Sequence, residues 1–474
     1  MKALTRNAII SVAALTLLSV ADTADAAVNV QCPGDNDGDA AWNTTTGRNK
    51  EYPPGDSKAV APDNTVCKHL IAGDSFVNMS DGNPLYTFGF GDQTGKALPQ
   101  DVIAAGILDA EWPGPTIDLD QGDEFYLSLT NVGTVIRPDL FDPHTVHFHG
   151  FPNAASVFDG VPEVSIAINM GATLTYYYNI VEPGTYIYHC HVEASEHMEM
   201  GMLANLWVRP AQNRLEDGTL LGTHVHSNPD NPTGSATSRI DDDPLIGDKY
   251  AYNDNDGTTL YHKELAIQVS SFDSNFHDAS FFVQPLPFAN LEATYPMING
   301  RGYPDTLIPG ALPAPKDDDA GKISDVPCAD HHTDPLSTCE PINNGTSTQT
   351  MSAVILDPDA PVPTRMDVVQ GEKLLLRMSN VSIDRFFTLT AQGLKMNIVG
   401  TGARQMKGET GLNLYREVAS VNFGGGETHD VIIDTAGVAA GTYFLHAAEA
   451  HQMSNLTQLD GGMITEIVIA AATP

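Results

Sequence analysis

Short apolar runs recur along the chain from about Thr87 onward, and residues that favour turns separate them. Residues 125–129 and 174–178 combine aromatic and aliphatic side chains, as strands do. Gly, Pro, Asn and Asp interrupt these runs, and helical periodicity is scarce. The pattern predicts an all-β chain built from β-sandwich domains.

Segments of the first half of the chain recur in the same order in the second half. Residues 118–131 match residues 367–380, since both read Asp-x-x-Gln-Gly-Asp/Glu before an apolar run that ends in Asn. Residues 184–189 match residues 441–446, since both begin Gly-Thr-Tyr and end in His. A Gly-Met pair before an apolar strand is the third shared feature. The repeat predicts two similar domains in tandem.

The repeat and the local composition divide the chain. We expect a first domain at residues 70–210 and a second at residues 259–474, which contains an acidic insert at 313–348. The segment 211–258 between them is rich in Asp, Asn, Gly, Ser and Pro, which is typical of a linker. Residues 27–69 form an N-terminal extension.

The first 26 residues have the features of a signal peptide. Lys2 and Arg6 precede or flank an apolar run at 8–21, and Ala24-Asp25-Ala26 fits a cleavage site. The run is too short for a stable membrane-spanning helix, and no later stretch is long and apolar enough, so we expect no membrane span. The sequence predicts an exported protein, either secreted or periplasmic.

Cysteine use and charge are consistent with export. Of the five cysteines, sequence proximity suggests the pairs Cys32–Cys67 and Cys328–Cys339, which leaves Cys190 as the odd thiol. The formal net charge is −36. Such a surface repels nucleic acid and anionic membranes and attracts cations. Nucleic acid is therefore not an expected partner.

Two histidine-rich segments, residues 144–150 and 189–191, carry the candidate chemistry. Successive side chains of a strand point to opposite faces. If the two segments are neighbouring strands, four imidazoles share one face, namely those of His147, His149, His189 and His191. The other face then carries His144 and Cys190.

The second face gains further ligands a few residues later. The resulting set is His144, Cys190, His197 and Met202. Two imidazoles, one thiolate and one thioether are the ligands of a blue-copper electron-transfer site, in which the methionine is the weak axial ligand. A single cysteine argues against structural zinc, which usually takes several thiolates.

The order His-x-x-His-x-His-Gly, His-Cys-His and His-x4-Met resembles the multicopper oxidase family. Residues 113–117 and 121–123 also resemble the start of a domain in that family. The resemblance implies cupredoxin-like Greek-key β-sandwiches, with a type 1 copper at the Cys190 site. It further implies a type 2/type 3 copper cluster that reduces dioxygen at the four imidazoles. The loop between Cys190 and His197 is two residues longer than is usual in the family. Met198 and Met200 are therefore rival axial ligands, although the spacing favours Met202.

The second domain lacks most of these residues. Ala447 stands opposite Cys190, which excludes a second blue site, and no imidazole occurs where the first histidine strand should recur. His446 stays in register and His451 lies near the position of His197, so these two are candidate ligands. Two-domain members of the family resemble copper nitrite reductases, trimers whose second copper centre lies between chains. The resemblance therefore implies a homotrimer.

Three functions remain open. The first is a copper oxidase, laccase-like or acting on metal ions, in which electrons from a phenol, Mn(II) or Fe(II) enter through an exposed His197 and pass along Cys190 to dioxygen. The second is a blue-copper electron carrier or copper-binding protein with a degenerate cluster. The third is a copper nitrite reductase, against which His147 and His191 argue because a mononuclear site does not need them.

The electron donor is the least determined part of this interpretation. Glu193, Glu196 and Glu199 lie in the loop that the donor must approach. Carboxylates are hard ligands that suit Mn(II) or Fe(II), so oxidation of metal ions is a hypothesis beside oxidation of phenols.

Overall fold

The computed structural model describes residues 65–94, 99–151, 155–229, 247–308 and 364–472. The predicted signal peptide and the predicted acidic insert lie outside these residues, as do Cys32, Cys328 and Cys339. Cys67 is disulfide-bonded. The two cysteine pairings and the domain boundaries stay predictions.

The first half of the described chain forms two four-stranded sheets. One has the order β2 (Pro84–Asp92), β1 (Thr65–Asn78), β4 (Glu124–Gly133) and β6 (Thr173–Asn179). The other has the order β3 (Ile117–Asp120), β8 (Leu203–Arg209), β7 (Gly184–His189) and β5 (His147–Phe148). Side chains of both sheets, among them Phe125 and Tyr188, share one buried core. The arrangement is a β-sandwich.

The second half repeats this plan with larger sheets. A seven-stranded sheet has the order β14 (Tyr295–Ile298), β13 (Lys263–Phe272), β16 (Lys373–Asn380), β22 (Thr428–Asp434), β18 (Met396–Thr401) and β19 (Arg404–Gln405), and β20 (Arg416–Val418) pairs with β18. A five-stranded sheet has the order β15 (Met366–Val369), β24 (Ile464–Ala470), β23 (Gly441–Ala447), β17 (Phe387–Ala391) and β21 (Ser420–Phe423). In β24, buried and less buried residues alternate, because one face packs on the core.

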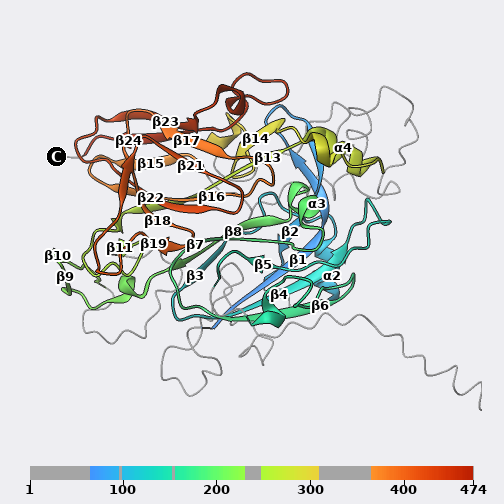
Figure 1. Cartoon of the computed structure of the whole chain (residues 1–474), viewed down its shortest axis with the longest axis horizontal. Coiled ribbons are helices and arrows are strands. Elements are labelled where there is room, and N and C mark those ends of the chain that lie inside the picture. Colours follow the sequence, from blue (N-terminus) through green and yellow to red (C-terminus); the bar gives the residue numbers. More distant parts are fainter. Residues whose placement is uncertain (1–64, 95–98, 152–154, 230–246, 309–363, 473–474) are drawn as a thin grey trace, which may run out of the picture.

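Strand pairing confirms the predicted repeat. β1 is parallel to β4 as β13 is to β16, and β3 is parallel to β8 as β15 is to β24. The hairpin of β7 and β8 corresponds to that of β23 and β24. Figure 1 shows the second half, in yellow, orange and red, lying against the first half, in blue and green. The expected all-β architecture is confirmed.

Helices are few and short among the described residues, as the sequence predicted. The α-helices are α2 (Pro99–Gly106), α3 (Ala194–Glu199) and α4 (Ser274–Phe281). Single 3-10 turns occur at η1 (Ser156–Phe158), η2 (Ala211–Arg214), η3 (Phe288–Asn290), η4 (Asp305–Leu307) and η5 (Ala450–Met453). No helix in the described ranges is long and apolar enough to cross a membrane.

The described parts of the predicted linker are folded against the body. They contain η2 and the short strands β9 (Leu220–Leu221), β10 (His224–Val225) and β11 (Lys249–Tyr250), the last of which pairs with β12 (Leu260–Tyr261). Gln212, Asn213 and Tyr250 are buried there. The polar composition therefore reflects turns and buried hydrogen bonds, such as that from the Tyr250 amide to Asn213 Oδ1 at 2.8 Å.

Polar contacts join the two halves. Glu264 accepts from Arg209 of the first half and Arg377 of the second, each at 2.8 Å. Thr185 on β7 donates to Asp430 Oδ1 at 2.6 Å and accepts from Thr428 at 2.8 Å. Strand β7, which leads directly into the histidine-cysteine segment, is therefore held by the second half.

Candidate metal centres

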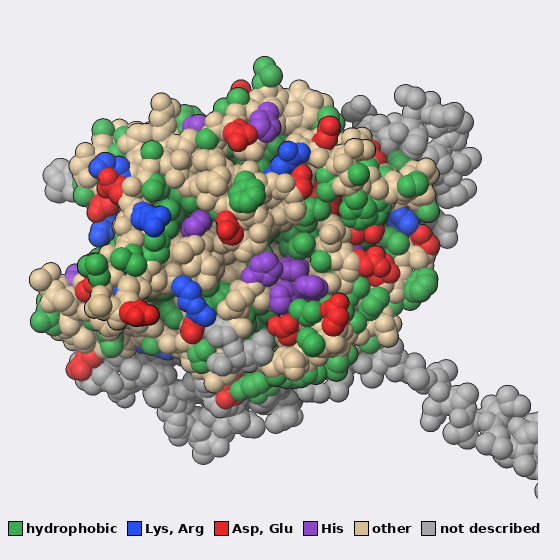
Figure 2. Space-filling model, in the orientation of Figure 1, with side chains coloured by type: hydrophobic (Ala, Val, Ile, Leu, Met, Phe, Trp, Pro, Cys, Tyr) green, Lys and Arg blue, Asp and Glu red, His purple; other side chains and the backbone are tan. Residues whose placement is uncertain are grey.

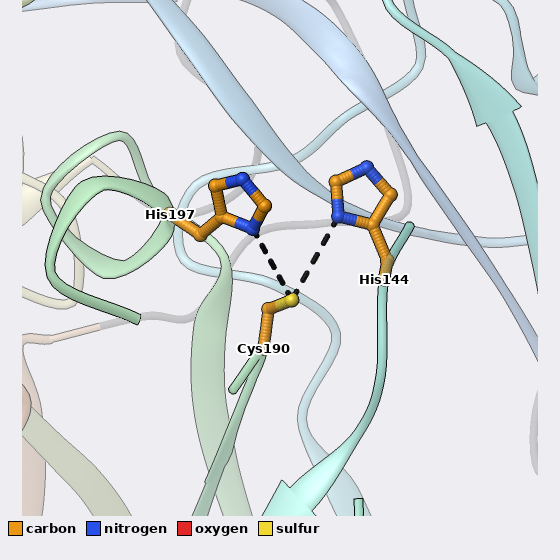
Figure 3. A group of neighbouring side chains, drawn as sticks. All are labelled: His144, Cys190 and His197. Carbon is orange, nitrogen blue, oxygen red and sulfur yellow. Dashed lines mark hydrogen bonds between the residues drawn. The ribbon is translucent and has the colours of Figure 1, made fainter. Parts of the chain in front are cut away.

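A buried group of one thiol and two imidazoles lies where β7 ends. Cys190 Sγ is 3.3 Å from His197 Nδ1 and 3.7 Å from His144 Nδ1. Figure 3 shows one ring nitrogen of each histidine directed at the sulfur. The short helix α3 carries His197, and a bridge to Ile168 holds His144. All three ligating side chains are buried.

These distances fit a single metal ion. Bond lengths of about 2.3 Å to sulfur and 2.0 Å to nitrogen separate the two atoms by roughly 3.5–3.7 Å at tetrahedral to trigonal angles, close to the observed distances. Burial lowers the pKa of His144 well below its ordinary value and that of His197 to about 4, so both rings are neutral ligands at neutral pH. Burial raises the pKa of the Cys190 thiol to about 11, so metal binding here must displace a proton. The soft donor set suits copper.

The axial position is supported by packing. Met202 is fully buried in the same core cluster as Cys190, and its carbonyl accepts from the Cys190 amide at 3.0 Å. Met200 also belongs to that cluster. Met198 packs instead against Ile187 and Leu203 in a separate cluster. Met202 stays the predicted axial ligand.

The second group of imidazoles lies on the opposite face of the same strands. His147 pairs with His189 across β5 and β7, and ligating nitrogens of His147, His149 and His189 lie within 4.8 Å of one another. The ring of His191 is 5.1 Å from that of His147, between centroids. In Figure 2 histidine side chains gather in one place on the molecular surface. The structure thus brings the four predicted residues together.

Backbone carbonyls orient three of these rings. His147 Nδ1 lies 2.6 Å from Asp159 O, His149 Nδ1 lies 3.2 Å from Gly426 O, and His189 Nδ1 lies 2.7 Å from Cys190 O. Because a carbonyl only accepts, each Nδ1 carries the hydrogen and each Nε2 keeps a free lone pair. Such partners are typical of metal-ligating histidines.

The nitrogens themselves indicate a cation between the rings. His149 Nε2 and His189 Nε2 are 3.0 Å apart, and neither has a hydrogen to donate in the neutral ring. Burial lowers the pKa of His189 to about 3 and also lowers that of His149, which disfavours a proton as the bridge. A bound metal ion removes the repulsion between the two lone pairs. The residues therefore fit copper.

Two expectations about the donor side are wrong. His197 is only 1% exposed rather than exposed, because α3 and the ring of Phe88 cover it. Glu199 is buried and accepts from the Asp273 amide at 2.7 Å, so it does not face a donor. Asp142, which was not among the residues expected from the sequence, groups with Glu193 and His197 instead.

The second half holds a modified copy of the first site. Thr390 pairs with His446 as His147 pairs with His189, and the Ala447 amide donates to Met463 O as that of Cys190 does to Met202 O. His446 Nδ1 lies 2.7 Å from Ala447 O, the same arrangement as at His189. No potential metal-binding group among the described residues includes His446 or the exposed His451.

The role of some residues around the sites could not be predicted from the sequence. Asp159 and Gly426 act through main-chain carbonyls, for which a sequence carries no signal. His277 on α4 contacts Tyr86 O at 2.6 Å through Nδ1 and Glu199 O at 3.1 Å through Nε2. The His277 ring thus lies between a main-chain carbonyl of α3 and one of β2 and links these two elements. Asp142 alone had a signal, since it lies two positions before His144.

Comparisons with known proteins agree with this geometry. Family models described as multicopper oxidase match residues 94–213 and 326–468. An L-ascorbate oxidase of Cucumis sativus is 35% identical over 120 residues, 24% of this chain and 18% of the relative. An iron transport multicopper oxidase of Epichloe festucae is 36% identical over 87 residues, 18% of this chain and 13% of the relative. The matches thus span less than a fifth of either relative.

Solved structures show the same fold. The blue copper oxidase from Nitrosomonas europaea aligns with a TM-score of 0.52 and 19% identity, covering 85% of each chain. This likeness, with the strand pairing above, bears out the expected tandem of two cupredoxin-like domains.

Proposed function

Because the chain belongs to the multicopper oxidase family, whose cofactor is copper, we propose that it is an oxidase that takes electrons from a small donor and passes them to dioxygen. His144, Cys190, His197 and Met202 would hold the donor-side copper. His147, His149, His189 and His191 would hold the copper that reacts with dioxygen. Copper at these sites supplies reversible one-electron chemistry, and four electrons with four protons convert dioxygen to two waters.

A single observation carries this proposal. Cys190 contributes its sulfur to one group, and its chain neighbours His189 and His191 contribute imidazoles to the other. The hydrogen bond from His189 Nδ1 to Cys190 O adds a second short connection. The segment 189–191 therefore links the proposed donor-side copper to the proposed copper that reacts with dioxygen.

The finer proposal is that the donor is a divalent metal ion, Mn(II) or Fe(II), rather than a phenol. Asp142 and Glu193 lie beside His197, and carboxylates suit such ions. Burial, followed by the charges of Glu193 and Asp142, raises the pKa of Glu196 to about 7, so this carboxyl is about half protonated at neutral pH. The net charge of −36 would also attract cations.

We further propose a homotrimer in which His446 of a neighbouring copy completes the second centre. Within the described part of one chain, the second domain adds no imidazole to the four. His446 is oriented through its Nδ1 as His189 is, so its Nε2 is free to bind. Exposed Phe386 lies next to Gly424, two positions before the glycine whose carbonyl contacts His149. Another copy bound there would bury Phe386.

Export is part of the proposal. The signal-like N-terminus and the disulfide-bonded Cys67 support an oxidising compartment, secreted or periplasmic.

An electron carrier is the second candidate, and the loss of imidazoles from the second domain favours it. Thr390 and Ala447 occupy the positions that correspond to His147 and Cys190. Such a protein would keep the blue site and reduce no dioxygen.

Oxygen uptake by the copper-loaded protein distinguishes the candidates. We expect uptake with Mn(II) or Fe(II), and expect Asp142→Asn with Glu193→Gln to slow it without affecting oxidation of a phenol. Equal loss with both donors would contradict the metal-ion proposal. A blue protein without uptake would favour the electron carrier, and nitrite would then be tested as the acceptor.

A further inference from the structure

A turn of the second domain touches the histidine cluster of the first. It comprises residues 424–427, between β21 and β22. Its Gly426 carbonyl accepts the hydrogen of His149 Nδ1 at 3.2 Å. The contact links the two domains at the cluster, although the second domain supplies none of the four imidazoles.

The turn is held firmly. The Gly426 amide donates to Asn380 O at 2.9 Å, and the Asn380 amide donates to Glu427 O at 3.0 Å. The Gly424 amide donates to Glu427 Oε2 at 2.7 Å, which closes the turn. Asn380 ends β16, a central strand of the larger sheet. The carbonyl that faces His149 therefore has a fixed position.

The approach of the turn to His149 requires glycine. Gly426 has φ +85°, and a Cβ at this position would lie 2.7 Å from His149 Cε1 and 2.9 Å from Nδ1. Any larger residue would push the imidazole away from the carbonyl. Gly426 thus suits this contact for two reasons: it adopts a left-handed backbone without strain, and it has no side chain to collide with His149.

We propose that this turn is a positioning element of the second copper centre, with Gly426 O fixing the tautomer and ring orientation of His149. The contact directs His149 Nε2 toward His189 Nε2, 3.0 Å away. The second domain thereby shapes the centre through its backbone. The inference rests on the proposed function only in taking the four imidazoles as copper ligands.

Gly426→Ala tests this directly, and Gly411→Ala is its matched control. Gly411 has φ +84°, but a methyl group added there would have nothing within 4 Å, so this variant shares the backbone strain without the contact. Thermal unfolding of the copper-free variants verifies that each is folded.

Copper titration followed by electron paramagnetic resonance and visible absorption gives the result. We expect Gly426→Ala to weaken copper at the second centre by about 10- to 100-fold, while the blue site keeps its affinity and colour. The Gly411→Ala control should match the parent protein. Equal copper affinity at the second centre in Gly426→Ala and Gly411→Ala would overturn the inference.

A milder pair of variants keeps the test decisive if Gly426→Ala does not fold. Glu427 is exposed, and Glu427→Ala removes the acceptor that closes the turn, whereas Glu427→Gln retains one. We expect weaker second-site copper in the first and rescue in the second; no difference between them would count against the inference. Oxygen uptake is a separate readout, so a parent protein that binds both coppers but takes up no oxygen would refute the oxidase alone.

Discussion

At the scale of single residues, the proposed donor-side centre depends on one sulfur. Cys190 is fully buried between two neutral imidazoles, and burial raises the pKa of its thiol. A thiolate is the ligand that gives a type 1 copper its colour, and a hydroxyl group of similar size cannot replace it. The same residue is part of the core cluster of the first domain.

Cys190→Ser should therefore abolish the blue colour and leave the fold intact. The buried hydroxyl lowers the free energy of unfolding of the copper-free protein by about 1–3 kcal/mol. Visible absorption after copper loading and urea unfolding measure the two effects. A variant that stays blue would contradict the assignment of Cys190 as a ligand.

At the scale of elements, α3 and α4 pack together at the proposed donor side. Helix α3 carries His197, and His277 of α4 contacts carbonyls of both α3 and β2. The ring of Phe88 on β2 packs edge-on against His197 at 5.9 Å between centroids. The position of His197 thus depends on contacts between three elements that are distant in sequence.

His277→Ala should loosen this junction. The substitution removes a fully buried ring and the one N–H that this neutral imidazole donates to a main-chain carbonyl, which lowers the free energy of unfolding by about 2–5 kcal/mol. Urea unfolding of the copper-free protein measures the loss. Asn275→Ala, at an exposed position of the same helix, is the control and should change stability little. Equal effects of the two variants would show that the carbonyl contacts of His277 do not stabilise the junction.

At the scale of the whole molecule, charge pairs join the two domains. Burial alone would raise the pKa of Glu264, but the charges of Arg209 and Arg377 outweigh it and lower the pKa from 4.5 to about 2. A depressed folded-state pKa stabilises the protein above the unfolded value. This contribution is lost as the pH falls from about 4.5 towards 2.

Glu264→Gln should lower the free energy of unfolding by about 1–3 kcal/mol at neutral pH, because it removes one carboxylate from Arg209 and Arg377, which keep their pairs with Asp118 and Asp430. The difference from the parent protein should shrink as the pH falls through that window, which urea unfolding at several pH values would show. Glu417→Gln, in an exposed pair with Lys395, should cost less than about 1 kcal/mol. A difference that stays constant with pH would contradict this role of Glu264.

The proposed trimer gives the other prediction at this scale. His446→Ala should lose copper at the second centre while keeping the blue site, and His451→Ala, at an exposed position, should retain both. Sedimentation of the parent protein should give three times the mass of one chain. A monomer with both copper centres intact would exclude the arrangement.

The sequence by itself determined the fold class and the candidate ligands that the alternation of side chains along a strand can place. Alternating faces separate His147 and His149 from His144 in an extended segment, because the side-chain period of extended backbone is fixed. The internal repeat likewise predicted the matching strand pairs and the absence of a second blue site at Ala447.

Only the tertiary structure decided which groups surround those ligands. The contacts of His149 with Gly426, and of His277 with Tyr86, join main-chain carbonyls to side chains that are far apart in the sequence. The burial of Glu199 and His197 also follows from packing between elements. A carbonyl is common to every residue, so its use as an acceptor leaves no pattern along the chain.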